Sequence, residues 1–157
     1  MRRGKSEYLL FFLTGAVCYG LIEILWRGRT HWTMLLTGGL CAALLHRCNR
    51  RHHALDWWSR CGLGCLIITA AELAVGWLVN VRLGMGVWDY SDKFGNLCGQ
   101  ICPEYSAYWY FLSMPVFGLS NAMVYFSSSQ NKTNAMLIDA IDTIDTIDTI
   151  DTGGKSC

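Results

Sequence analysis

The chain has 157 residues, of which 52% are hydrophobic, and its formal net charge is +1. This length favours a single domain, and a net charge so close to zero gives no basis for predicting nucleic-acid binding. The mean hydropathy is positive, and the chain contains seven Trp and seven Tyr. Because amphipathic aromatic residues gather where membrane helices meet lipid headgroups, this composition favours a membrane protein over a small soluble domain.

The apolar residues form four blocks, separated by segments that hold most of the charge. A helix that crosses the hydrocarbon core needs about 20 residues, and the second block reaches that length only with its polar flanks. We therefore predict an all-α fold, an integral membrane bundle of four transmembrane helices. The expected membrane domain covers residues 8–127, after a basic N terminus at 1–7, and its helices cover residues 8–26, 31–48, 61–81 and 105–126.

Basic residues are distributed unevenly around these blocks. Seven precede the first block or lie between the second and third, whereas four lie in the other two connections. Because Lys and Arg are enriched in cytoplasmic loops, we expect both termini in the cytoplasm and the loop between the third and fourth helices outside. The basic start also resembles a signal peptide, but no small-residue cleavage pattern follows it, so we expect an uncleaved first helix.

Eight cysteines lie mostly in or beside the expected helices, where cysteine behaves as a small apolar residue. Their spacing contains no CxxC or Cys-His pattern typical of structural zinc, so we predict no metal site and no cofactor. His46, His52 and His53 follow the second block together with Cys48. We interpret these residues as part of a solvated basic turn beside the membrane surface.

The C-terminal segment, residues 128–157, is an acidic tail of low complexity. From Ile138 to Thr152 it consists of one Ile-Asp-Ala and four Ile-Asp-Thr triplets. A period of three matches neither the 3.6 of a helix nor the 2 of a strand, and the repeated aspartates repel one another. We therefore expect a disordered or weakly ordered tail, and without the glycine turn of a calcium loop we predict no calcium site there.

Glu72 is a carboxylate inside an otherwise apolar predicted helix. An ionised group at the centre of a membrane helix costs about 2.5 to 3.5 kcal/mol, so such groups face other helices or a water-filled cavity. Glu72, Gly76 and Asn80 follow one another at intervals of four residues and share one stripe of a helix. A small and polar stripe of this kind suits close contact and hydrogen bonds between membrane helices.

Glu23 is the second candidate for a buried carboxylate, near the outer end of the first helix. Pairing with Arg27 or Arg29, or reaching the interface, is the simpler interpretation for it. For Glu72 two alternatives stay open. The two carboxylates either relay protons or coordinate a cation, or they form hydrogen bonds between helices as protonated or paired acids.

The loop after the third helix is dense in polar and aromatic groups. Residues 94–103 are expected to form an interfacial loop or a short helix that either caps the bundle or lines a cavity. No Walker loop, HExxH, GxSxG or catalytic triad is visible, so no catalytic residue is predicted. The candidate functional residues of this loop are Trp88, Asp89, Tyr90, Ser91, Asn96 and Gln100.

The spacing Glu72-x3-Gly76-x3-Asn80, followed by the runs 87–91 and 99–102 and by Trp109, resembles the Putative ABC-transporter type IV family. The resemblance extends over roughly residues 20–118. It implies a small multi-pass protein of a bacterial plasma membrane, labelled a transporter permease, with no assigned substrate and no assigned catalytic residues.

A permease-like subunit of unknown substrate is the function that this resemblance favours. The chain has no nucleotide-binding motif of its own, so a separate ATPase subunit is expected as a partner, besides membrane lipids and either further copies of the chain or other membrane subunits. The alternative is a non-transporting assembly or sensor subunit, or a membrane-embedded lipid-modifying enzyme that uses Glu72 and Asp89.

Overall fold

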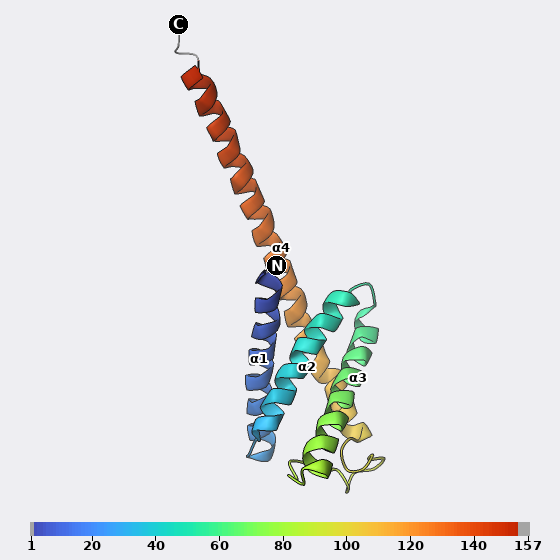
Figure 1. Ribbon diagram of the computed structural model, residues 1–157. Helices are drawn as coiled ribbons and strands as arrows, with labels where there is room; N and C mark the ends of the chain where they lie inside the picture. Colours follow the sequence, from blue (N-terminus) through green and yellow to red (C-terminus); the bar gives the residue numbers. More distant parts are fainter. Residues whose placement is uncertain (1, 154–157) are drawn as a thin grey trace. The chain divides into compact units, whose positions relative to one another are not determined.

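The computed structural model describes residues 2–153, and in that range the chain forms helices, turns and one isolated bridge between Leu97 and Ile101, without any strand. The all-α prediction is therefore confirmed for the described residues. The helices are α1 (Arg2–Arg27), α2 (Trp32–Arg51), α3 (Trp57–Gly76), the short π-helix η1 (Trp77–Arg82) and α4 (Pro103–Gly153) (Figure 1).

The chain divides into two units within α4. The first unit ends at Ser120 and the second begins at Asn121. In the first unit α1, α2 and α3 follow one another up and down beside the beginning of α4 (Figure 1). Two of its helices are long and apolar enough to cross a membrane, over Ser6–Arg27 and Trp57–Arg82. α2 carries several charged residues near its C-terminal end, and α4 begins with many Tyr, Trp and Ser, which lowers their hydropathy.

Short turns with specific end residues join the first three helices. α1 ends at Arg27 and is followed by Gly28, whose φ of +69° lies in the left-handed region that glycine adopts without strain. α3 begins after Asp56, whose side chain accepts a hydrogen bond from the backbone N–H of Ser59 at 3.0 Å. That bond stabilises the ionised carboxylate and lowers the pKa of Asp56. Such tight connections make consecutive helices antiparallel neighbours.

Glycines bring the backbones of α1 and α2 close together. A Cβ atom at Gly39 would lie 2.7 Å from the carbonyl oxygen of Phe12, and a Cβ atom at Gly15 would lie 2.8 Å from the carbonyl oxygen of Gly38. Small residues at helix contacts allow this approach in membrane bundles, where packing takes the place of the hydrophobic effect.

The apolar core lies where α2, α3 and the first part of α4 meet. Leu45 and Phe117 are almost fully buried in it, and Cys41 and Cys61 fill the same cluster as small apolar groups. Cys98, in the loop after η1, is exposed and has a φ of 52°. The buried cysteines of α2 and α3 therefore contribute to packing, whereas Cys18 on α1 is exposed.

His46 and Cys48 do not lie in a solvated turn but are buried, which corrects the interpretation of the residues after the second block. The His46 side chain is fully buried in α2, the ring of Phe11 stacks on it at a centroid distance of 4.0 Å, and its Nδ1 lies 2.8 Å from Ser120 Oγ. The reason is that α2 continues to Arg51, so His46 falls inside the bundle. His52 and His53 follow the helix end and are exposed, as expected.

Through the Ile-Asp repeat the structure continues α4 as a helix to Gly153. Extending a helix that already exists avoids the cost of nucleation, so a segment of modest propensity can follow a well-formed one. The side chains of Asp142 and of the residues beyond 143 lie outside the described ones.

The close approach of α1 and α2 gives a first prediction. Gly39→Ala should lower the free energy of unfolding by about 1–3 kcal/mol, because the new Cβ meets the rigid backbone of Phe12. Gly62→Ala is the matched control, since nothing lies within 4 Å of its Cβ position, and it should be neutral or stabilise the helix by up to about 1 kcal/mol. Unfolding in detergent, followed by circular dichroism, measures both, and equal effects would contradict the close contact.

Candidate functional site

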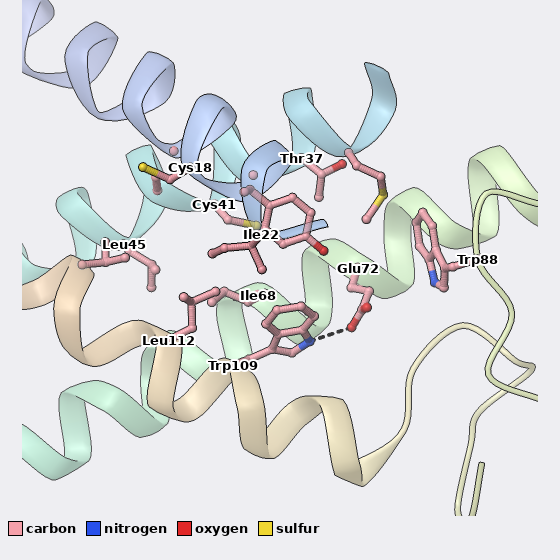
Figure 2. A pocket seen from close by; sticks show the side chains of 16 residues that line it. Cys18, Ile22, Thr37, Cys41, Leu45, Ile68, Glu72, Trp88, Trp109 and Leu112 are labelled. Carbon is pink, nitrogen blue, oxygen red and sulfur yellow. Dashed lines mark hydrogen bonds between the residues drawn. The ribbon is translucent and has the colours of Figure 1, made fainter. Parts of the chain in front are cut away.

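Glu72 lies on α3 and joins it to two other parts of the chain. The side chain is 4% exposed. Its Oε1 accepts a hydrogen bond from the Tyr90 hydroxyl at 2.9 Å. Its Oε2 accepts one from the Trp109 indole Nε1–H at 2.8 Å, which Figure 2 shows as a dashed line. Tyr90 comes from the loop after η1 and Trp109 from α4, so the carboxylate connects three segments that are distant in sequence.

Contacts between aromatic rings hold the two donors of Glu72 in place. The ring of Tyr90 stacks on Tyr105 at a centroid distance of 4.3 Å, and Tyr105 is in turn in contact with Trp109 at 6.2 Å. Burial, followed by the nearby Glu72 carboxylate, raises the pKa of the Tyr90 hydroxyl. Tyr90 therefore keeps its proton near neutral pH and remains a hydrogen-bond donor to Glu72.

Asn80 fixes the loop against the end of η1. Its Nδ2 donates to the Trp88 carbonyl at 3.0 Å and to Gln100 Oε1 at 2.9 Å, and its Oδ1 accepts from the Val87 N–H at 2.7 Å. The Trp88 indole donates to the Gln100 carbonyl at 3.1 Å. Gly76 leaves the room for this contact, because a Cβ there would lie 2.5 Å from Gln100 Oε1.

The other loop candidates form a separate group on the outer side of the loop. Asp89 Oδ1 accepts from the Ser91 N–H at 2.9 Å, and these bonds to Ser91 lower the pKa of Asp89. Asn96 Nδ2 donates to the Lys93 carbonyl at 2.9 Å, and Asn96 Oδ1 accepts from the Gly99 N–H at 3.0 Å. The described bonds of Asp89, Ser91 and Asn96 thus stay within the loop and do not reach Glu72.

Glu23 lies near the C-terminal end of α1, beside the turn that leads to α2. Its Oε1 is 3.0 Å from Arg27 Nη1, and its Oε2 accepts from the Thr30 hydroxyl at 2.5 Å. Arg27 Nη2 also donates to the Val87 carbonyl at 2.9 Å, so this ion pair is linked to the start of the loop. Pairing with Arg27 was one of the alternatives expected for Glu23. A cavity of about 180 Å³ lies beside this pair, lined also by His31.

A cavity of about 90 Å³ lies beside Glu72, between α1, α2, α3 and α4. Figure 2 shows the Glu72 carboxylate turned toward Trp109, with Trp88 from the loop on another side. The remaining walls are mostly apolar. Besides those three residues, the lining includes Tyr19, Ile22, Met34, Thr37, Cys41, Leu45, Ile68 and Leu112.

Sequence reasoning missed two aromatic residues of this site, Tyr19 on α1 and Tyr105 on α4. Tyr105 precedes Trp109 by four residues, and Tyr19 precedes Glu23 by four, so both pairs share a helix face. That spacing could have indicated the two tyrosines as candidates, but it does not show which helix each face contacts. Among the described residues, no group of three or more His, Cys, Asp or Glu is placed to hold a metal ion.

Asn80 provides the second prediction. Asn80→Ala removes all three bonds and leaves the Gln100 and Val87 groups without their partner, which should lower the free energy of unfolding by about 2–4 kcal/mol. Hydrogen exchange at residues 83–102 should accelerate. Asp92→Asn, an exposed change in the same loop, should alter neither quantity, and unchanged exchange in Asn80→Ala would show that Asn80 does not hold the loop.

None of the curated proteins and none of the solved structures matches the chain. One family model, described as Putative ABC-transporter type IV, matches residues 9–152, which cover α2, α3, the loop and most of α1 and α4. The chain therefore belongs to the Putative ABC-transporter type IV family.

Proposed function

We propose that the chain is a multi-pass protein of a bacterial plasma membrane and a permease-like subunit of a transport system. Its family is named for ABC transporters. The observation that carries the proposal is Glu72, a buried carboxylate that lines a cavity between the helices. Ionisable groups in such positions typically belong to the pathway of an ion or a solute.

The exposed apolar surface supports a membrane location. Only 17% of the most apolar window of Ser6–Arg27, and 28% of that in Trp57–Arg82, is buried inside the protein. A core helix of a soluble protein would be mostly buried. α2 and the start of α4 also expose large apolar side chains, including Leu36 and Phe111. We therefore infer that these two helices complete a four-span bundle.

The position of the charges supports one orientation of this bundle. Glu7 near the start of α1 pairs with Arg50 near the end of α2 at 2.7 Å, so the basic N terminus lies at the same end as the α2–α3 turn. Arg27 and Val87 meet at the opposite end, with the loop at 83–102. The positive-inside rule assigns the first end, and with it the N terminus, to the cytoplasm. Four spans then leave the C-terminal tail in the cytoplasm as well.

The chain by itself carries no ATPase motif, so a permease role requires partners. We infer that a separate ATPase subunit, together with further copies of the chain or other membrane subunits, completes the transporter. Membrane lipids cover the exposed apolar helix faces. No cofactor is part of this proposal.

A partner-binding role is the second candidate, and Phe94 favours it. This side chain is 96% exposed in the loop that the proposed orientation places outside. An assembly or sensor subunit would use such a ring to contact another protein. A lipid-modifying enzyme that pairs Glu72 with Asp89 is not supported, because the described bonds of Asp89 remain within the outer part of the loop.

The partner requirement gives the third prediction. The tagged protein, purified in mild detergent from its native membrane, should retain an ATPase subunit at a stoichiometric level that mass spectrometry identifies. Glu72→Gln should keep this partner and its abundance, because the amide has almost the same shape, but it should abolish solute flux. Glu23→Gln, a change of the other buried carboxylate, is the control and should retain flux. Isolation of the chain alone would count against the permease role.

The orientation gives the fourth prediction. Cys98 is exposed in the loop, so a membrane-impermeant maleimide added to intact cells should label it. Cys98→Ser should remove that labelling, while permeabilised cells show the labelling of cytoplasmic thiols. Labelling of Cys98 only after permeabilisation would reverse the proposed topology.

A further inference from the structure

The cavity beside Glu72 has the features of a binding site for one class of ligand. We propose that it binds a small organic cation, an alkylammonium group, with Glu72 as the counter-ion and aromatic rings around the alkyl part. This inference rests on the proposed function, for which it names the class of substrate.

Glu72 has no positively charged partner among the described residues. The chain has four glutamates, and all are among the described residues. The other three form salt bridges: Glu7 with Arg50 at 2.7 Å, Glu23 with Arg27 at 3.0 Å and Glu104 with Lys93 at 3.2 Å. Within the part of the chain that the structure describes, Glu72 accepts hydrogen bonds only from the neutral donors Tyr90 and Trp109. A buried carboxylate without a basic partner is costly unless it is protonated or a ligand supplies the positive charge.

Aromatic side chains line the cavity beside Glu72. Tyr19, Trp88 and Trp109 all line the cavity with Glu72, and the rings of Tyr19 and Trp109 are 6.1 Å apart. Aromatic faces attract organic cations through the ring quadrupole, most strongly where water is excluded. The Tyr19 hydroxyl makes no hydrogen bond to another described residue, so it is available to accept an N–H from an ammonium group.

The size and the apolar walls of the cavity suit a short alkylammonium group. A single water needs about 10–15 Å³ of such volume, so a cavity of about 90 Å³ has room for a short alkyl chain with its ammonium group. Ile68 and Leu112 supply apolar walls for the chain (Figure 2). A metal cation fits less well, because Ca²⁺ or Mg²⁺ requires six or more oxygen ligands and the cavity offers one carboxylate.

The test uses the full chain in phosphatidylglycerol nanodiscs, titrated with butylammonium chloride and followed by calorimetry and tryptophan fluorescence. We expect saturable binding that Glu72→Gln weakens at least tenfold and Tyr19→Phe weakens a few-fold. Glu23→Gln, which changes a carboxylate outside this cavity, should remain within twofold of the wild type. Butanol, with the same chain length and no charge, should bind at least tenfold more weakly than butylammonium.

Two results would overturn the proposal: equal binding of butanol and butylammonium, or unchanged butylammonium affinity in Glu72→Gln. If Glu72→Gln does not fold, Tyr19→Phe and the butanol comparison decide, since the Tyr19 hydroxyl has no partner to lose. Nanodiscs with phosphatidylethanolamine identify the source of the ammonium group: competition indicates a lipid headgroup, and its absence indicates a free amine. Loss of ammonium binding with an ATPase still bound would refute only this inference, not the permease role.

Discussion

The buried carboxylate of Glu72 is the constraint on which the arrangement of this end of the molecule depends. Removing an acid from water requires that both oxygens find donors, and α3 by itself has none to offer. The donors come from Tyr90 in the loop and Trp109 in α4. The loop must therefore fold back onto the bundle, and α4 must present its aromatic face to α3.

Asn80 and Gly76 help to hold the loop against the bundle. Asn80 lies in the short π-helix η1 rather than in a regular turn of α3. Its side-chain amide donates hydrogen bonds to Trp88 and to Gln100, near the two ends of the loop. Widened helical turns of this kind are rare and frequently accompany functional sites, because they redirect side chains that a regular helix would place elsewhere. Gly76 then provides the space in which Gln100 and Trp88 pack against the helix.

A second polar network lies at the opposite end of the bundle. His46 Nδ1 and Asn49 Nδ2 both contact Ser120 Oγ, and Arg60 Nη1 donates to Asn49 Oδ1 at 2.8 Å. These bonds connect α2, α3 and α4 near the end where basic residues gather. The first unit is therefore held by polar contacts near both ends, while large apolar side chains remain on its outer surface. In a lipid environment this distribution is favourable, because the surface needs no polar groups and the interior contacts supply specificity.

Much of this organisation was already determined by the sequence. Apolar runs and short turns predicted the helices, Glu72 stood out as a carboxylate in an apolar helix, and the motif around it indicated the family that the comparison confirmed. The candidates Asn80, Trp88, Tyr90 and Gln100 could be named because polar and aromatic groups cluster there. Only the tertiary structure separated them from Asp89, Ser91 and Asn96. It also added Tyr19 and Tyr105 to the candidate site and placed His46 inside the bundle. Periodicity specifies the faces of one helix, whereas the partner of each face is decided by packing and hydrogen bonding between segments distant in sequence.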